Sequence, residues 1–214
     1  MKAIILAAGV SRRLYPLTYD TPKCLLEVGG RPIIDFQMGA LRKAGISKTI
    51  IVVGYFKEKL IEHIQGEYPD FDTTFITNEH FFETNTAYSL YLCRKEFRDS
   101  EMLLMNADVL YPDELLERLM ASSHENVMAV DVKECGREEV KVIAGSDDKL
   151  VAIGKELIQE NSLGEFIGVA RFNVPFGEKL AASLEHLIDS GGKDDYFEAA
   201  IHPLLTEMEV HYID

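Results

Sequence analysis

The sequence predicts an α/β fold with a mostly parallel sheet and helices on both of its faces. Short continuous apolar runs, such as residues 3–7, alternate with segments whose apolar residues recur at helical spacing. This alternation is typical of parallel sheets, because a crossover helix joins parallel neighbours. At 214 residues, with 47% hydrophobic and 27% charged, the chain is expected to form a single domain, residues 1–214.

Strands and helices alternate through the first 132 residues. The segment 33–43 has apolar residues at Ile34, Met38 and Leu41 and stops before Gly45, as a capped helix does. Pro112 suits the first turn of a helix, where its missing N–H is not needed. In chain order we expect strand 3–7, helix 33–43, strand 49–53, helix 57–64, strand 74–77, helix 86–97, strand 102–105, helix 112–121 and strand 127–132.

The second half of the chain changes character. Apolar runs at 140–143 and 150–153 flank the turn cluster Gly-Ser-Asp-Asp at 145–148, which predicts a hairpin. We therefore expect a small hairpin subregion near residues 133–165. The remaining expected elements are strand 166–172, helix 177–188, helix 196–205 and strand 210–213.

The charge is acidic overall and uneven along the chain. The net charge of −14 argues against general nucleic-acid binding. Residues 1–48 hold eight Lys or Arg and three acids, a balance of +5, which leaves −19 for the rest. A basic segment in an acidic protein indicates a local anion site, with chance clustering of surface lysines as the alternative.

Cysteine usage and hydropathy favour a cytoplasmic protein. Cys24, Cys93 and Cys135 are widely spaced and form no C-x-x-C pair, so a disulfide framework or a zinc site is not expected. No apolar run reaches the roughly 18 residues that a membrane span needs. The apolar N-terminal run is too short for a signal peptide and leads into Arg12 and Arg13.

The loop after the first strand is the most informative segment. Residues 6–14 read Leu-Ala-Ala-Gly-Val-Ser-Arg-Arg-Leu. Small residues let the backbone approach a ligand, and free N–H groups in such a loop bind phosphate oxygens. Ligands of open α/β sheets bind outside the carboxyl ends of the strands, where this loop lies. The alternative interpretation is an ordinary turn of small residues.

Charged and polar residues elsewhere are placed to reach the same ligand. Lys23 supplies a point charge suited to phosphate, unless it is an isolated surface lysine. Asp108 follows the strand at 102–105, where one carboxylate suits Mg²⁺ completed by substrate phosphates. Its alternative role is a helix cap, although it stands well before Pro112. The pattern predicts transfer to or from a nucleotide phosphate.

Three polar residues and the histidines are less specific. Asn78, Asn85 and Ser89 suit hydrogen bonds to a base or ribose, and Asn85 equally suits the N-cap of the next helix. The six histidines show no paired spacing, so we interpret them as surface or structural residues. There is no nucleophile elbow and no H-E-x-x-H zinc pair.

Together these segments resemble the sugar-1-phosphate nucleotidyltransferases. The resemblance begins with Leu-Ala-Ala-Gly-x-x-x-Arg-Leu at 6–14, continues with Thr-Pro-Lys at 21–23, and includes Asn-Ala-Asp at 106–108. It narrows to the cytidylyltransferase branch that acts on phosphocholine, 2-aminoethylphosphonate and related small phospho-compounds. The segments that carry this narrower resemblance are 83–90, 124–126, 151–155, 164–168 and 195–200.

The resemblance implies a Rossmann-like three-layer sandwich of the nucleotide-diphospho-sugar transferase type. It also implies CTP and a small phosphorylated acceptor as substrates, Mg²⁺ as cofactor, and pyrophosphate as leaving group. Arg13, Lys23 and Asp108 take the catalytic roles, with Asp108 as metal ligand. The residues expected at the nucleotide are Leu6, Ala7, Ala8, Gly9, Asn78, Asn85, Ser89 and Asn106, and those expected at the acceptor are Lys155, Glu165, Tyr196 and Glu198.

The acceptor residues suit a cationic head group, because ammonium groups favour aromatic faces and carboxylates. For Tyr196, a core position at a helix start is the alternative. Two other functions of the whole chain are alternatives to cytidylyl transfer. One is a sugar-1-phosphate nucleotidyltransferase that makes an NDP-sugar, and the other is a catalytically silent nucleotide-binding module.

Two departures from the family pattern bear on these alternatives. Ser11 and Arg12 stand where relatives usually have Gly and Ser or Thr. Relatives also usually continue to a Trp-x-Glu-Ile-Asp segment whose acid is similar to a second metal ligand. This chain contains no Trp and stops at Asp214. The sequence leaves open whether a C-terminal segment is missing or the ligand is naturally absent.

Overall fold

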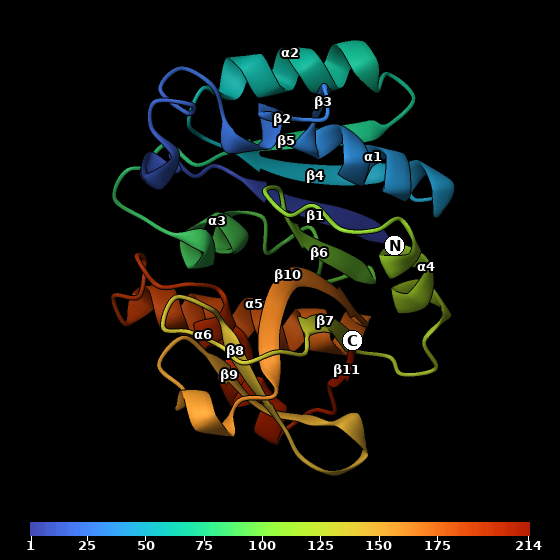
Figure 1. Cartoon of the computed structure of the whole chain (residues 1–214), viewed down its shortest axis with the longest axis vertical. Coiled ribbons are helices and arrows are strands. Elements are labelled where there is room, and N and C mark those ends of the chain that lie inside the picture. The colour runs from blue at the N-terminus through green and yellow to red at the C-terminus, as the bar shows by residue number, and fades with distance from the viewer.

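A computed structural model describes all residues 1–214, and a single continuous sheet dominates it (Figure 1). The strands are β1 (Lys2–Ala7), β2 (Glu27–Val28), β3 (Arg31–Pro32), β4 (Lys48–Val53), β5 (Asp72–Thr77), β6 (Met102–Asn106), β7 (Val127–Asp131), β8 (Lys141–Ala144), β9 (Leu150–Gly154), β10 (Gly164–Phe172) and β11 (His211–Ile213). The α-helices are α1 (Ile33–Lys43), α2 (Lys57–Glu67), α3 (Thr86–Leu92), α4 (Glu114–Ala121), α5 (Val174–Asp189) and α6 (Glu198–Ile201).

The sheet runs in the order β11-β7-β10-β6-β1-β4-β5. Within this path β1, β4, β5 and β6 are parallel neighbours, as are β7 and β11. Strand β10 is antiparallel to both of its neighbours, and β8 and β9 form the expected hairpin at its end. The predicted α/β class with a mostly parallel mixed sheet is confirmed.

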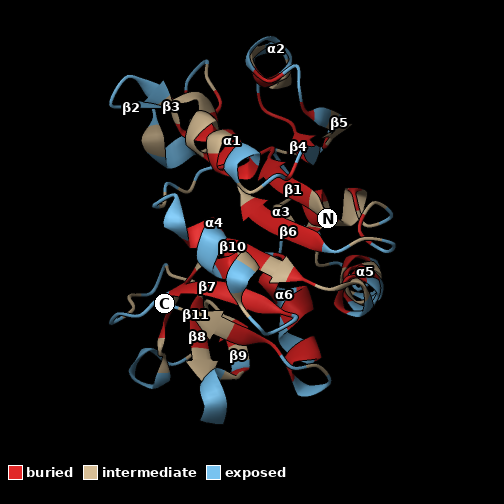
Figure 2. Ribbon diagram, turned by 90° about the vertical axis from the view of Figure 1, so that its right-hand side faces the viewer, coloured by how far each residue is buried: buried red, intermediate tan, exposed pale blue.

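Both faces of the sheet are covered, because its central strands send alternate side chains to opposite sides. In β1, Ile4 and Leu6 enter one core with residues of α3, α5 and α6, whereas Ala3 and Ile5 enter the other with residues of α1, α2 and α4. Figure 2 shows this three-layer arrangement, with buried residues along the sheet and on the inner helix faces. No helix has the length and apolar character needed to cross a membrane.

Two expected helices are shorter than the pattern indicates. The helix expected at 86–97 ends at Leu92, and residues 93–97 continue as turns that carry the fully buried Phe97 into the core. The helix expected at 196–205 divides into α6 and a 3-10 turn, His202–Thr206. Pro203 explains the division, because it has no N–H to continue the α-helical hydrogen bonds.

Candidate active site

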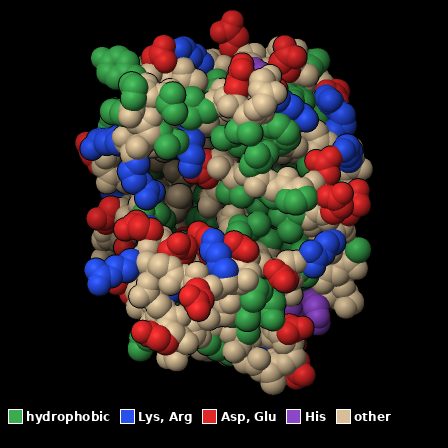
Figure 3. Space-filling model, in the orientation of Figure 1, with side chains coloured by type: hydrophobic (Ala, Val, Ile, Leu, Met, Phe, Trp, Pro, Cys, Tyr) green, Lys and Arg blue, Asp and Glu red, His purple; other side chains and the backbone are tan.

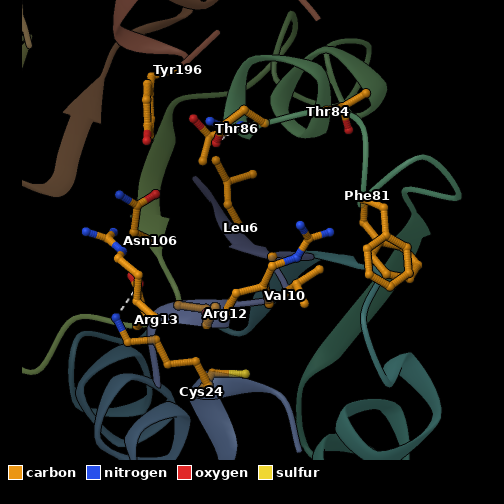
Figure 4. Close-up of a pocket in the computed structure, with 18 of the residues that line it drawn as sticks. Leu6, Val10, Arg12, Arg13, Cys24, Phe81, Thr84, Thr86, Asn106 and Tyr196 are labelled. Atoms are coloured by element: carbon orange, nitrogen blue, oxygen red, sulfur yellow. Dashed lines mark hydrogen bonds and ion pairs between the residues drawn. The ribbon is translucent and has the colours of Figure 1, made fainter. Parts of the chain in front are cut away.

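A cavity of about 580 Å³ opens at the carboxyl ends of β1 and β6. Figure 3 shows the hollow with acidic and basic side chains at its rim, and Figure 4 shows Arg12, Arg13 and Cys24 facing Tyr196 and Thr86 across it. The fold thus brings together residues far apart in sequence. The predicted site residues that line it are Leu6, Ala7, Gly9, Arg13, Lys23, Asn85, Asn106, Asp108, Tyr196 and Glu198.

The loop after β1 forms one wall of this cavity. Ser11 adopts the left-handed conformation, with φ 53° and ψ 45°, at the position where a glycine was expected. That conformation costs an L-residue about 1–2 kcal/mol. The Thr18 hydroxyl donates to the Ser11 carbonyl at 3.0 Å, and the Leu14 N–H donates to the same oxygen at 3.0 Å. These bonds support a strained turn that presents the following arginines.

Lys23 and Asp108 form an ion pair at the base of the cavity. The Lys23 Nζ donates to Asp108 Oδ2 at 2.8 Å, and the two side chains remain 32% and 43% exposed. Lys23 comes from a 3-10 turn, Lys23–Leu25, and Asp108 from the segment after β6. Nowhere do three or more His, Cys, Asp or Glu side chains gather into a metal site, so Asp108 is a single carboxylate at this point.

Cys24 lies beside this pair and also lines the cavity. Burial, and secondarily the Asp108 carboxylate, raises the pKa of the Cys24 thiol to about 12. The thiolate is the nucleophilic form of cysteine, and it is scarce at neutral pH when the pKa is so high. Cys24 is therefore a packing residue of the cavity wall.

The two arginines of the loop have different surroundings. The Arg12 guanidinium lies 5.6 Å from the centre of the Phe82 ring, which gives this departure from the family pattern a cation–π contact. Arg13 is 84% exposed, and its Nη1 lies 3.6 Å from Glu138. Glu138 also lies 3.7 Å from the Lys155 Nζ. One carboxylate oxygen of Glu138 thus lies between the Arg13 and Lys155 cations.

A second cavity of about 520 Å³ adjoins the first, and Tyr196 and Glu198 line both. Lys155 lines the second cavity, and its Nζ lies 4.3 Å from the centre of the Tyr196 ring. The same Nζ donates to the Tyr196 hydroxyl at 3.1 Å. A 38% exposed Tyr196 at this junction is not the core residue that was the alternative.

Glu198 is buried at the junction of the two cavities. The residue is 4% exposed, and its Oε2 has no hydrogen-bond partner. Burial raises the pKa of this carboxyl to about 7, although its own backbone N–H and the Lys155 charge oppose the shift. An unpartnered buried carboxyl oxygen is costly. Glu198 is therefore poised to accept a hydrogen bond from a ligand.

Glu165 does not belong with the other expected acceptor residues. It lines neither cavity, and its carboxylate pairs with the Lys133 Nζ at 2.7 Å. The neighbour Phe166 enters the core, so the alternation along β10 sends Glu165 to the opposite side. Glu165 thus lies apart from Lys155, Tyr196 and Glu198, which line the second cavity.

A small recess of about 60 Å³ adjoins the main cavity beside the loop. Asn78 is 1% exposed, and its amide donates to the hydroxyls of Thr84 at 3.0 Å and Ser89 at 3.1 Å. Its carbonyl accepts from the His80 N–H. Ala8, Asn78, Asn85 and Ser89 all line this recess. Asn85 also caps α3 by accepting from the Thr86 N–H at 2.9 Å, as its alternative interpretation predicted.

The geometry agrees with a match to the family model described as nucleotidyl transferase, which covers residues 2–139. The chain belongs to this family. The matched segment includes the glycine-containing loop, Lys23 and Asp108. The nucleotidyl transferase fold thus accounts for the part of the cavity built from β1 and β6.

Several relatives that match over most of the chain are cytidylyltransferases. A choline-phosphate cytidylyltransferase of Streptococcus pneumoniae is 31% identical over 99% of this chain and 87% of its own length. A CTP:phosphoglutamine cytidylyltransferase of Campylobacter jejuni is 29% identical, over 87% and 79%. A 2-aminoethylphosphonate cytidylyltransferase of Lancefieldella rimae is 27% identical, over 97% and 82%.

The solved structure of a cytidylyltransferase also matches this chain. The CTP:phosphocholine cytidylyltransferase from Streptococcus pneumoniae aligns with a TM-score of 0.79 at 29% identity, covering 99% of this chain and 88% of that one. The resemblance to the cytidylyltransferase branch of the nucleotidyl transferases is confirmed.

Two structural features of this nucleotidyl transferase were not predicted from the sequence. Gly168 has φ +82°, and a Cβ there would lie 2.4 Å from the Asn106 amide nitrogen, so only glycine lets β10 pack on the end of β6. Gln37 of α1 is 1% exposed and reaches the backbone on both sides of Asp108. A polar residue within an apolar helical stripe is the sequence signal that could have identified it.

Proposed function

We propose that this chain transfers a cytidylyl group from CTP to a small phospho- or phosphono-compound that carries an ammonium group, with release of pyrophosphate. Phosphocholine and aminoethylphosphonate represent the acceptor class. We further propose that residues 1–214 act as one nucleotidyltransferase domain in the cytoplasm. The site residues from Leu6 to Glu198 lie around one continuous sheet, and the three cysteines are free thiols.

The observation that carries the proposal is the buried carboxyl of Glu198 beside Tyr196, in the same cavity as Lys23 and Asp108. A sugar pocket would present neutral hydroxyl partners. Here a carboxyl with an unpartnered Oε2 and an exposed aromatic ring stand together, which suits a cation. The relatives described above are named for choline-phosphate and aminoethylphosphonate, and this agrees with a cationic head group.

The wall of the cavity formed by the loop after β1 suits a triphosphate. Arg13 and the N–H groups around Gly9 would bind its oxygens, and the small recess near Asn78 would receive the base. Asn78 acts through Thr84 and Ser89, because its own amide is engaged with them.

The residues also fit a magnesium ion. Asp108 is a half-exposed carboxylate at a strand end, and Mg²⁺ needs only one or two carboxylates when substrate phosphates supply the other oxygens. When bound there, the ion would neutralise charge on the triphosphate. Lys23, paired with Asp108 at 2.8 Å, would exchange this contact for oxygens of the α-phosphate.

The reaction requires positioning more than proton transfer. A phosphate or phosphonate oxygen of the acceptor attacks the α-phosphorus of CTP, and the bond to pyrophosphate breaks on the opposite side. The acceptor is ionised at neutral pH, so no strong general base is needed. Lys155 would hold the acceptor phosphate, leaving the Tyr196 ring free for the ammonium group. Orientation and charge neutralisation then lower the barrier.

A pyrophosphate-release screen tests this assignment. Each of the four NTPs is paired with phosphocholine, aminoethylphosphonate, inositol phosphate and glucose-1-phosphate. We expect release with CTP and an ammonium-bearing acceptor. Preference for glucose-1-phosphate would favour an NDP-sugar enzyme, and binding of CTP without release from any acceptor would favour a silent module.

Replacing Glu198 with glutamine is expected to remove a pH dependence of acceptor binding. With a pKa of about 7, the Glu198 carboxyl is largely neutral at pH 6 and ionised at pH 8. An ammonium acceptor prefers the ionised form, so the wild-type KM for the acceptor should fall roughly tenfold between these pH values. At pH 8, Glu198→Gln should have a higher acceptor KM than the wild type. Its KM should also lack the part of the pH dependence that comes from ionisation of the Glu198 carboxyl. Steady-state kinetics at fixed saturating CTP measure both.

The matched control is Glu165→Gln, whose carboxylate pairs with Lys133 outside the cavities and should leave the KM unchanged.

Stability gives a second readout. The raised pKa means that the folded state binds more protons, so wild-type stability should fall as pH rises from about 4.5 to about 7. Glu198→Gln should lose that slope. An unchanged acceptor KM at pH 8 would remove Glu198 from the acceptor site.

A further inference from the structure

The side-chain amide of Gln37 bridges the backbone on both sides of Asp108. Its Nε2 donates to the Asn106 carbonyl at 2.9 Å and to the Val109 carbonyl at 2.8 Å. Gln37 belongs to α1, which is separated from these carbonyls by about seventy residues of sequence. The amide therefore spans the short segment that carries the cavity carboxylate.

This segment makes few other hydrogen bonds. The Ala107 N–H donates to the Leu6 carbonyl at 3.1 Å, and the amides of residues 108–111 donate to no backbone carbonyl. The only other bond of Asp108 is the ion pair with Lys23. Without the Gln37 amide, the polar contacts of the chain beyond β6 would be the Ala107 hydrogen bond and one half-exposed ion pair, beside the packing of Ala107 and Tyr111 on the core.

A buried glutamine at this position costs free energy of folding, and packing alone does not explain why it is there. Gln37 lies on the buried stripe of α1, between Ile34 and Met38, and is itself 1% exposed. Its Oε1 is buried and has no hydrogen-bond partner. An apolar side chain of similar volume would fill the same space without burying an unpartnered oxygen. Both donor hydrogens of the amide, in contrast, are used on the Asp108 segment.

We propose that Gln37 is a positioning residue, which holds segment 106–109 so that the Asp108 carboxylate faces Lys23 and the substrate phosphates. The proposal rests on the function proposed above. Groups that orient a metal-ligating or phosphate-binding side chain typically affect activity 10–100-fold when they are removed. A merely structural tie between α1 and β6 would instead affect mainly the stability of the fold.

The test compares Gln37→Met with Met38→Leu, a volume-conserving change on the same helix stripe. Methionine matches the shape of glutamine but donates no hydrogen bond. We expect Gln37→Met to lower kcat about 10–100-fold and to change the KM for CTP less than threefold. Its melting temperature should stay within a few degrees of wild type. Met38→Leu should retain the wild-type kcat.

Hydrogen exchange provides a readout that does not depend on turnover. Gln37→Met should accelerate exchange of the Ala107 amide, the amide of this segment that donates to a backbone carbonyl, and leave β1 and β4 unchanged. A kcat within threefold of wild type, or acceleration spread over the whole sheet with a matching loss of stability, would overturn the proposal. If the wild-type enzyme transfers no nucleotide at all, the proposed function fails. Local exchange then still decides whether Gln37 holds the Asp108 segment.

Discussion

Lys23→Ala is expected to lower turnover about 10²–10³-fold while weakening CTP binding much less. The Lys23 Nζ lies 2.8 Å from Asp108 at the point where the proposed reaction develops charge on the transferring phosphate. An interaction that strengthens in the transition state affects kcat more than ground-state binding. Loss of one such donor typically costs this much in rate. Turnover by pyrophosphate release and CTP affinity by calorimetry separate the two effects.

The chain offers a closely matched control for this change. Lys57 also pairs with an acid, Glu79, at 2.9 Å, and its side chain is 29% exposed against 32% for Lys23. Lys57 does not line the main cavity. Lys57→Ala should therefore leave kcat unchanged. Equal losses in both variants, or turnover of Lys23→Ala within a few-fold of wild type, would exclude Lys23 from the mechanism.

Asp108→Asn is expected to reduce metal-dependent turnover by about 10³-fold or more and to leave the fold intact. Asparagine keeps the size of the side chain but removes the charge that Mg²⁺ requires, and metal stabilisation of a phosphoryl transition state is worth several kcal/mol. The half-exposed carboxylate packs little, so its loss should cost little stability. Turnover against Mg²⁺ concentration and thermal melting measure the two effects.

Asp113→Asn is the counterpart of this variant. Asp113 pairs with Lys43, its side chain is 45% exposed against 43% for Asp108, and it lies outside the cavity. Its replacement should leave the magnesium dependence unchanged. If Asp108→Asn itself kept the wild-type magnesium dependence, Asp108 would be assigned to structure.

The fold was predictable where local pattern and burial agree. The run Ala3 to Ala7 could only be a strand covered on both sides, and α1 has both apolar periodicity and a glycine stop. Helix ends were less predictable, because Phe97 follows its burial in the core rather than the helical period. Long-range packing decides such ends, and it leaves no local signal.

The cavity was predictable because its residues follow the strands of one sheet edge. The hydrogen-bond and ion-pair partners of these residues were not predictable from the sequence. Asn78 looked like a base-reading group, but its amide is engaged by Thr84 and Ser89, eleven residues or fewer away. The family resemblance implied that Glu165 contacts the acceptor. In the structure its carboxylate pairs with Lys133, because the alternation of side chains along β10 directs it to that side. Which of several polar groups face the ligand depends on cross-strand neighbours.

The Glu138 carboxylate pairs with two of the cations proposed to bind the substrate phosphates. This carboxylate lies 3.6 Å from the Arg13 guanidinium and 3.7 Å from the Lys155 Nζ, and it is 77% exposed. Exposed pairs of this kind are worth at most about 1 kcal/mol each, so a multiply charged substrate displaces Glu138 readily. A small anion gains less from the exchange. Under the proposed function, the contacts of Glu138 would therefore slightly disfavour singly charged salt ions at this site relative to a substrate that carries several negative charges.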